Sequence, residues 1–376
     1  MTGLRAAVAW HVFDLSGSAF QLGLLGVVGF LPALGLSLVG GAVADAHDRR
    51  RVAQLAQLAE LSGAAALAAA SALGAASLPL LFAVVFTCAV AAAFEGPARV
   101  SLLPLLVPRS RFANAVTIHS TAQALAFVTG PALAGISIAA AGAAGAYALA
   151  ACLLALAIAT LAPLRPRAPE GLRRPVGLDA IREGLAFVRR QPVLLGCMTL
   201  DMFAVIFGGA TALLPIYASE ILHVGPRGYG ALSASLEAGA LVTSILLVLR
   251  PPLVEQGRAL LLAVGLFGIA TIAFGLSRSF PLSIAAYAAV GMADQVSVVM
   301  RSTIIQMATP DELRGRVTSI NMIFIGASNQ LGAMESGFVA ALTSAPFAVV
   351  SGGAACLLVV TAVASRLPEL RRYRAA

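Results

Sequence analysis

Charge is scarce in this sequence. Charged residues make up 11% of the 376-residue chain, hydrophobic residues make up 59%, and the mean hydropathy is +0.92. A water-soluble domain of this length could not cover its surface with so few charges. The composition therefore excludes a soluble globular protein and indicates a chain whose solvent is mostly lipid.

Lysine is absent, so all 25 basic residues are arginines. The net charge of +8 would suit a nucleic-acid partner. However, if the N-terminus of a complete first helix is cytoplasmic, twenty of the arginines fall on the inner segments, and Arg227 and Arg278 fall on outer loops. This asymmetry follows the positive-inside rule, predicts a cytoplasmic C-terminus and makes a nucleic-acid partner unnecessary.

Cysteine is rare, and the usual signatures of enzyme chemistry are missing. The four cysteines stand singly in apolar stretches, without the spacing of a metal site or of a disulfide framework. The sequence has no Ser/His/Asp set, no metal-spaced histidines and no phosphate-binding loop of the Walker type. We therefore expect no metal, no cofactor and no enzymatic activity, and ATP is not the expected energy source.

Long apolar runs dominate the chain instead. A helix needs roughly 20 apolar residues to cross the hydrocarbon core of a bilayer. Eleven runs reach that length, at 20–44, 52–74, 78–102, 114–140, 143–163, 191–219, 228–249, 258–277, 280–305, 317–343 and 345–366. A shorter apolar piece, residues 4–13, precedes them, and we interpret it as part of a first helix whose beginning is missing.

An internal repeat divides these runs into two halves. Sliding the sequence over itself by 202 residues aligns Arg99 with Arg301 and Pro108 with Pro310, with a Val-Thr pair following each proline. The predicted organisation has four parts: an N-terminal helix bundle at 1–163, a cytoplasmic linker with an amphipathic helix at 164–190, a C-terminal helix bundle at 191–366 and a cytoplasmic tail at 367–376.

The loop between the second and third predicted helices runs from Gly40 to Arg51 and combines glycines, acids and arginines. It resembles motif A of the major facilitator superfamily, whose glycine, acid and basic residues correspond here to Gly41, Asp45, Arg49 and Arg50. In that family the acid helps to latch the outward-open state. The sequence departs from the usual motif at Ala46 and at Asp48.

Two further segments resemble particular parts of that superfamily. Residues 94–109 look like the fourth helix and following loop of the transmembrane secretion effector branch, which includes the enterobactin exporter and macrolide efflux proteins. Gly130, Pro131 and Gly135 resemble motif C, the signature associated with antiporters. A proline that removes a backbone hydrogen bond and glycines that thin the helix would together produce a bend into which neighbouring helices pack.

The resemblance implies the fold and the function. We expect an all-α membrane protein with the major facilitator fold: two six-helix bundles related by pseudo-two-fold symmetry, the first helix being incomplete, working as a monomer in a bacterial-type inner membrane. The expected activity is proton-coupled efflux of a small organic molecule by alternating access. The alternatives are an uptake symporter, or a non-transporting scaffold or defunct truncated transporter.

Charged residues inside the apolar runs are the best candidates for proton coupling or for lining a cavity, because a charge at the bilayer centre is costly without a partner or water. The acids within these runs are Glu60, Glu95, Asp201, Glu237, Asp294 and Glu335. The candidates retained are Glu95, Arg99, Asp201, Glu237, Asp294, Arg301 and Glu335.

The roles of these charges stay open at the level of sequence. Glu95, Asp201 or Asp294 is the expected proton carrier, although a structural ion pair is an alternative for each acid. Glu95 and Arg99 are four residues apart on one helical face and are able to pair with each other. Arg99 and Arg301 would either bind an anionic group or neutralise an acid.

Overall fold

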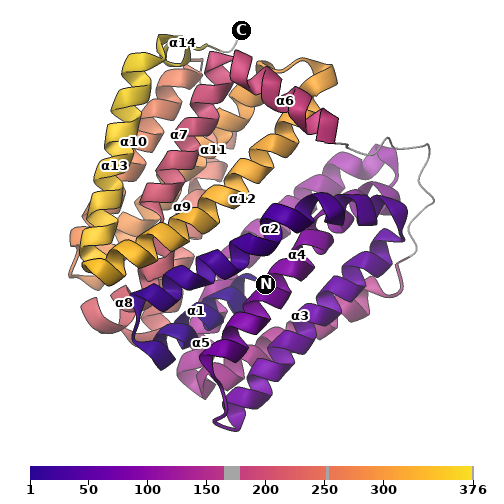
Figure 1. Cartoon of the computed structure of the whole chain (residues 1–376), viewed down its shortest axis with the longest axis vertical. Coiled ribbons are helices and arrows are strands. Elements are labelled where there is room, and N and C mark those ends of the chain that lie inside the picture. The colour runs from indigo at the N-terminus through magenta and orange to yellow at the C-terminus, as the bar shows by residue number, and fades with distance from the viewer. Residues whose placement is uncertain (165–177, 251–253, 375–376) are drawn as a thin grey trace. The chain divides into compact units, whose positions relative to one another are not determined.

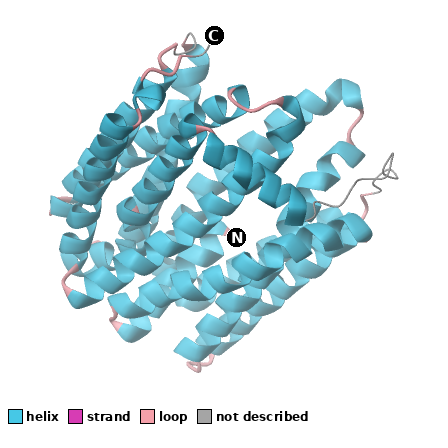
Figure 2. Cartoon of the chain, turned by 45° about the horizontal axis from the view of Figure 1, so that its top comes forward, coloured by secondary structure: helices cyan, strands magenta, loops and turns pink. Residues whose placement is uncertain are grey.

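The computed structural model is built from α-helices joined by short turns (Figures 1 and 2). It describes residues 1–164, 178–250 and 254–374, and within these ranges it contains no β-strand. The side chains of a few helical residues, Asp45 among them, lie outside the described part. The helical content confirms the predicted all-α fold class.

The chain forms two compact units. Unit 1 comprises Met1–Gly17, Val27–Pro175 and Gly225–Ala231, and unit 2 comprises Ser18–Gly26, Val176–Val224 and Leu232–Ala376. The units are therefore not two uninterrupted halves of the sequence, because short segments at Ser18–Gly26 and Gly225–Ala231 cluster with the unit formed mainly by the other half.

Most of unit 1 consists of long helices that pack along their lengths. α3 packs against α4 and α5, and α1 also packs against α5 (Figure 1). The helices contributing to this unit are α1 (Thr2–Ser16), α2 (Ala19–Ala46), α3 (Arg49–Ala72), α4 (Leu78–Leu106), the 3-10 turn η1 (Arg109–Arg111) and α5 (Phe112–Leu161).

α5 contains a break in its backbone that separates two predicted spans. Ala141 and Gly142 have non-helical backbone angles, and Gly142 has φ 65°. Glycine suits this position because it adopts positive φ without the steric penalty of a β-carbon. The break falls between the predicted runs 114–140 and 143–163, so α5 contains two membrane-length helices joined end to end.

In unit 2, α10 packs against α11 and α13, and α7 packs against α12 and α13 (Figure 1). The elements that contribute to this unit are α6 (Leu178–Arg190), α7 (Pro192–Gly208), η2 (Ala210–Leu213), α8 (Leu214–Ile216), η3 (Tyr217–Ile221), α9 (Gly225–Leu249), α10 (Gln256–Leu276), α11 (Phe280–Met307), α12 (Asp311–Leu342), α13 (Ala345–Arg366) and α14 (Pro368–Arg371).

The predicted run 191–219 is not one regular helix. α7 stops at Gly208, Gly209 is non-helical, and the chain continues through a 3-10 turn, a short α-helical turn and a π-helical turn to Ile221. Gly208 packs closely on α10, because a β-carbon there would lie 2.1 Å from Cε1 of Phe267. Pro215 follows, and it lacks the backbone N–H that a regular helix needs.

Eight helices among the described residues are long and apolar enough to cross a membrane. One of these eight is α5, which contains two of the predicted runs. The two remaining predicted runs correspond to α2, whose apolar part at Ala19–Pro32 is shorter, and α12, whose sequence carries several charges. Together these helices cover all eleven predicted runs.

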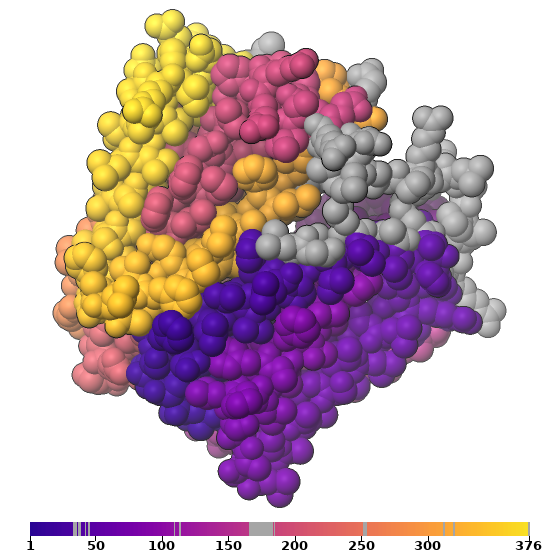
Figure 3. Space-filling model, in the orientation of Figure 1, coloured from indigo at the N-terminus to yellow at the C-terminus, as the bar shows by residue number. Residues whose placement is uncertain are grey.

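Many large apolar side chains point outward. Leu342 is 86% exposed and Leu358 is 72% exposed, on α12 and α13. Figure 3 shows the side chains of these two helices forming a broad surface of unit 2. Such a surface is stable in a hydrocarbon solvent, since lipid does not penalise exposed leucine as water does.

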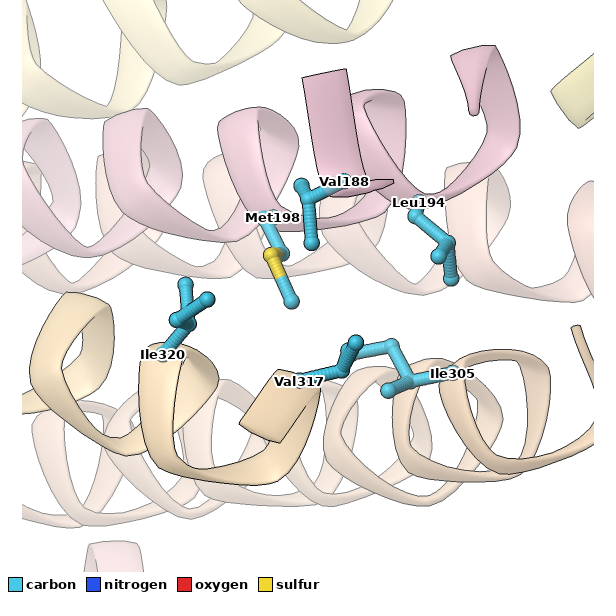
Figure 4. Close-up of a cluster of buried hydrophobic side chains, with 6 residues drawn as sticks. All are labelled: Val188, Leu194, Met198, Ile305, Val317 and Ile320. Carbon is cyan, nitrogen blue, oxygen red and sulfur yellow. The ribbon is translucent and has the colours of Figure 1, made fainter. Parts of the chain in front are cut away.

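A compact apolar cluster attaches α6 to unit 2. It consists of Val188, Leu194, Met198, Ile305, Val317 and Ile320, which come from α6, α7, α11 and α12 (Figure 4). An ion pair adds to the same attachment, because Arg316 of α12 lies 2.5 Å from Glu183 of α6. α6 therefore packs on unit 2 through both apolar and charged contacts.

Candidate functional site

Unit 2 contains a buried ion pair between Asp201 on α7 and Arg301 on α11. Asp201 is 7% exposed and Arg301 is 2% exposed. Because burying an unpaired charge is expensive, each residue compensates the other. The structure therefore gives Arg301 one of the two roles considered from the sequence, neutralisation of an acid.

Asp294 lies beside this pair without an ion-pair partner among the described residues. It lines a small pocket between α7, α10 and α11, about two helical turns before Arg301 on the same helix. Glu237 on α9 is close enough to repel Asp294 electrostatically. The pocket is lined by Asp201, Ala204, Val205, Val264, Phe267, Asp294 and Ser297.

Three of the four candidate acids in this unit are thus brought together, and the fourth is not. Asp201 and Asp294 share the pocket, and Glu237 acts on Asp294 from the neighbouring helix. Glu335 on α12 is half-buried, and it accepts a 3.4 Å hydrogen bond from the hydroxyl of Ser336, the next residue. The cluster of unit 2 therefore consists of Asp201, Glu237, Asp294 and Arg301.

In unit 1, Glu95 and Arg99 of α4 form the pair that their spacing allows. Nη1 of Arg99 lies 3.7 Å from Oε1 of Glu95. Gln57 of α3 also donates a hydrogen bond of 3.1 Å from Nε2 to the same carboxylate oxygen. The side chain of Arg99 is 51% exposed, while that of Glu95 is 12% exposed. Glu95 therefore has two polar partners, and Arg99 reaches toward the surface of the unit.

Glu60 on α3 is a buried acid that the candidate set from the sequence missed. It is 0% exposed, and neither of its carboxylate oxygens has a hydrogen-bond partner among the described residues. Glu95 is the nearby acid whose charge acts most strongly on it. The signal in the sequence was an acid within an apolar run, where a buried charge costs free energy. The sequence does not reveal whether another side chain pairs with that acid.

The motif A segment forms the junction of α2 and α3. The carboxylate of Asp48 caps α3 by accepting hydrogen bonds from the backbone N–H groups of Arg50 and Arg51. Asp48, at which the sequence departs from the usual motif, therefore serves as the N-cap of α3. The side chain of Asp45 lies outside the described part of the chain, so its gating role remains a prediction.

The arginines of motif A differ in their surroundings. Arg50 donates hydrogen bonds from Nη1 to the backbone oxygens of Ala162 and Leu164, at 2.9 and 2.8 Å. Arg49 is buried, with 7% exposure. These contacts tie the start of α3 to the end of α5 within unit 1.

Close helix packing at motif A depends on Gly40 and not on Gly41. A β-carbon on Gly40 would lie 2.1 Å from the backbone oxygen of Ala93 in α4, whereas one on Gly41 would meet nothing within 4 Å. The closely packed position is therefore one residue before Gly41, the glycine that corresponds to the motif A glycine. The physical reason is helical geometry, since adjacent residues point in directions about 100° apart.

The motif C glycines form a close packing surface on α5. A β-carbon on Gly130 would lie 2.1 Å from Oγ1 of Thr2, and one on Gly135 would lie 2.5 Å from the backbone oxygen of Pro226 and 2.7 Å from Cα of Gly230. Because glycine has no side chain, α1 and the first turn of α9 can approach the backbone of α5 at these two positions. Within unit 1, Pro131 lies in the same stretch, where its backbone oxygen would be 2.9 Å from a β-carbon on Gly230.

Polar and aromatic contacts support the same packing. Tyr229 donates a 3.0 Å hydrogen bond to the backbone oxygen of Ala6, and its ring centroid lies 5.4 Å from that of Trp10. The hydroxyl of Thr2 donates to the backbone oxygen of Ala126 at 3.0 Å. These bonds join α1, α5 and the start of α9 around the motif C stretch.

No group of three or more potential metal ligands occurs in the described ranges. The four cysteines, Cys88, Cys152, Cys197 and Cys356, are all free. The polar features of the units are therefore acids, arginines and amides inside helical bundles, an arrangement typical of transport proteins.

Comparison with known proteins identifies the family of this chain. A family model described as transmembrane secretion effector matches residues 4–376. The chain is 31% identical over 380 residues to the Multidrug efflux pump Tap of Mycobacterium tuberculosis, which covers 97% of this chain and 89% of that protein. It is 23% identical over 351 residues to Macrolide efflux protein A of Streptococcus pyogenes, which covers 90% of this chain and 85% of that protein.

Solved structures show the same fold at low sequence identity. A bacterial homologue of the human lysosomal transporter Spinster, in an inward-facing and unoccupied conformation, matches with a TM-score of 0.71 and 16% identity, over 100% of this chain and 95% of that one. The peptide transporter POT in complex with sulfate matches with a TM-score of 0.74 and 14% identity, over 100% of this chain and 92% of that one.

The family model and the efflux relatives identify the protein. It is a multi-pass membrane transporter and not an enzyme, and it belongs to the transmembrane secretion effector family of the major facilitator superfamily.

Proposed function

We propose that this transporter exports small amphipathic organic molecules of the drug or siderophore type, driven by the inward flow of protons. The observation that carries the proposal is the similarity to Multidrug efflux pump Tap across 97% of the chain. Similarity to Macrolide efflux protein A over 90% of the chain supports the same direction of transport and an organic substrate.

The buried acids of both units support proton coupling. Asp294 lines a pocket and forms no ion pair in the part of the chain that the structure describes, and Glu237 repels it. A carboxyl group in such surroundings is more stable when protonated, because burial and a nearby negative charge both oppose ionisation. Asp201 has Arg301 as a counter-ion and Glu95 has Arg99, so Asp294 is the strongest of the three acids expected to carry protons.

Alternating access by rocking of two bundles is the proposed transport mechanism. The proposed bundles are residues 1–163 and 191–366, connected by the linker 164–190 and followed by the tail 367–376. Asp45 of motif A and the glycines of motif C, Gly130 and Gly135, are the proposed conformational control points. We further propose a location in the cell inner membrane with a cytoplasmic C-terminus, on the basis of the arginine distribution. A monomer is proposed from the family to which the chain belongs.

Efflux from intact cells tests the proposal. Cells expressing the full chain would be loaded with ethidium, erythromycin or a catecholate siderophore, and loss of each compound would be followed with and without a protonophore. We expect faster loss of one compound than in cells with empty vector, and abolition of that difference by the protonophore. Net accumulation would indicate an uptake symporter, and efflux that resists the protonophore would overturn proton coupling.

Variants of the acids refine the same assay. Asp294→Asn is expected to abolish protonophore-sensitive efflux while the protein still inserts in the membrane. The matched control is Glu220→Gln, which neutralises an exposed acid of η3. If Glu95→Gln, Asp201→Asn and Asp294→Asn all leave proton-coupled efflux intact, none of these acids carries the proton.

A further inference from the structure

Glu60 is buried in unit 1 with its hydrogen-bonding capacity unused. It is 0% exposed, and both carboxylate oxygens lack a partner within the described part of the chain. A buried ionised carboxylate normally accepts several hydrogen bonds or pairs with a cation, because removing it from water is otherwise very costly. The surroundings of Glu60 therefore favour its neutral, protonated form.

The charged groups around Glu60 do not supply the missing counter-ion. They come from α1 and α4: Glu95, the amino group of Met1, Arg5 and Arg99, with the thiol of Cys88 also facing Glu60. Glu95 repels a negative charge on Glu60, and Arg99 pairs with Glu95. Neither carboxylate oxygen of Glu60 forms a hydrogen bond with the Met1 amino group, Arg5 or Arg99.

Gln57 supplies a second, independent observation. Its amide Nε2 donates to Glu95, but its amide oxygen is buried and has no hydrogen-bond partner among the described residues. Gln57 and Glu60 are three residues apart on α3, so their side chains are neighbours on one face of the helix. An ionised Glu60 would leave three buried acceptor oxygens unpaired, whereas a protonated Glu60 has an O–H group to donate to Gln57.

We propose that Glu60 is a proton-binding residue of the transport cycle, connected through the side-chain amide of Gln57 to Glu95. In the protonated state the O–H of Glu60 donates to the oxygen of Gln57, whose Nε2 donates to Glu95. When conformational change admits water to the site, the proton passes to that water, and the carboxylate left on Glu60 is stabilised by hydrogen bonds from the same water. This inference rests on the proposed proton-driven export and assigns part of the coupling to unit 1.

A proton suits this site better than an organic substrate does. Glu60 has no exposed surface in this conformation, so a molecule of drug size could not contact its carboxylate. A proton needs no additional volume. Substrate binding should therefore tolerate loss of the Glu60 carboxyl group, while coupling to the proton gradient should not.

Two transport modes of the purified full chain in proteoliposomes separate these roles. One is uphill accumulation of ethidium or erythromycin driven by a pH gradient, and the other is exchange of labelled for unlabelled compound without a gradient. We expect Glu60→Gln to lose uphill accumulation and retain exchange within about twofold, because glutamine mimics the neutral acid but cannot release a proton. Glu220→Gln should retain both activities. Uphill accumulation equal to wild type in Glu60→Gln would overturn the proposal.

A direct titration makes the test independent of transport. Infrared difference spectra of the wild-type protein in detergent, recorded across neutral pH, should contain the signal of a protonated carboxyl that ionises, and this signal should be missing in Glu60→Gln. Gln57→Leu should shift the titration to a different pH, whereas a merely structural role for Gln57 would leave it in place. The same carboxyl signal in wild type and Glu60→Gln would overturn the assignment.

The two measurements distinguish failure of the inference from failure of the proposed function. If wild type shows no uphill accumulation, proton-driven export fails, and the infrared titration still decides whether Glu60 binds a proton. If wild type accumulates substrate uphill and Glu60→Gln does so equally, the role of Glu60 fails alone. Should Glu60→Gln not fold, Glu60→Asp provides the second variant, with a retained but shifted carboxyl titration as the expected result.

Discussion

Arg301 on α11 is paired with Asp201 on α7, and both residues are buried. Its counterpart in the sequence repeat, Arg99, is instead paired with Glu95 of its own helix and is half exposed. The two arginines therefore occupy equivalent repeat positions but have different electrostatic surroundings. The ion pair in unit 2 connects two helices, whereas the ion pair in unit 1 lies within α4 and the polar link to α3 comes from Gln57.

Breaking the buried pair should be strongly destabilising. Asp201→Asn leaves the Arg301 guanidinium without its counter-ion, and loss of one partner of a buried pair costs about 3–5 kcal/mol. We expect a markedly lower melting temperature in detergent. The double variant Asp201→Asn with Arg301→Met should recover part of this loss, because it removes the uncompensated charge.

A surface pair provides the matched control for this experiment. Arg316 and Glu183 lie 2.5 Å apart, but their side chains are 36% and 59% exposed. Glu183→Gln is therefore expected to cost about 0–1 kcal/mol. If Asp201→Asn melts at the same temperature as Glu183→Gln, the buried pair does not make the predicted contribution.

The fold was accessible from the sequence because lipid imposes a simple pattern on helices. Run length alone located the spans, and the break at Gly142 lies where two runs meet. The interruption after Gly208 was not predicted, and neither was the close packing of Gly208 on Phe267 of another helix. Periodicity along one helix carries no information about such a contact.

The candidate site was accessible only in part. Lone charges in apolar runs identified Asp201 and Arg301, but nothing in the sequence pairs residues so far apart. The i,i+4 spacing did indicate the Glu95–Arg99 pair. Glu60 was left out because its distinguishing property is the lack of a hydrogen-bond partner, which is a property of the folded environment.

The cap at the start of α3 gives a second prediction. Asp48→Ala removes the acceptor for the backbone N–H groups of Arg50 and Arg51 and should reduce stability by about 1 kcal/mol. Asp48→Asn keeps an acceptor oxygen and should melt close to wild type. Equal melting temperatures for Asp48→Ala and Asp48→Asn would contradict a capping role and would favour a purely electrostatic role for this acid.

The C-terminal tail gives a third prediction, which concerns pH. Glu255 accepts hydrogen bonds from Arg258 at 2.8 Å and from Arg374 at 2.5 Å, and these bonds hold the pKa of Glu255 below its usual value of 4.5. The backbone N–H of Gly257 also donates to the backbone oxygen of Tyr373 at 3.2 Å. The tail is thereby attached to the start of α10.

Because the folded-state pKa of Glu255 is lowered, its contribution to this attachment is present above the ordinary pKa and is lost as pH falls through the lowered value. We expect hydrogen exchange at the Gly257 amide, corrected for its intrinsic pH dependence, to remain slow from neutral pH to about pH 4.5 and to accelerate below it. Glu255→Gln should remove this pH dependence. Acceleration at the same pH in Glu255→Gln would assign the effect to another group.

The motif C glycine Gly135 gives the last prediction, and Gly41 of motif A is its control. A β-carbon at Gly135 would lie 2.5 Å from the backbone oxygen of Pro226, and backbone atoms cannot move aside as a flexible side chain can. Gly135→Ala should therefore force the first turn of α9 away from α5 and reduce efflux severely while the protein remains inserted. Gly41→Ala meets open space, so it should leave both the melting temperature and efflux close to wild type. Wild-type efflux in Gly135→Ala would mean that this close packing is not needed in the transport cycle, and the motif C resemblance would then lose its structural basis.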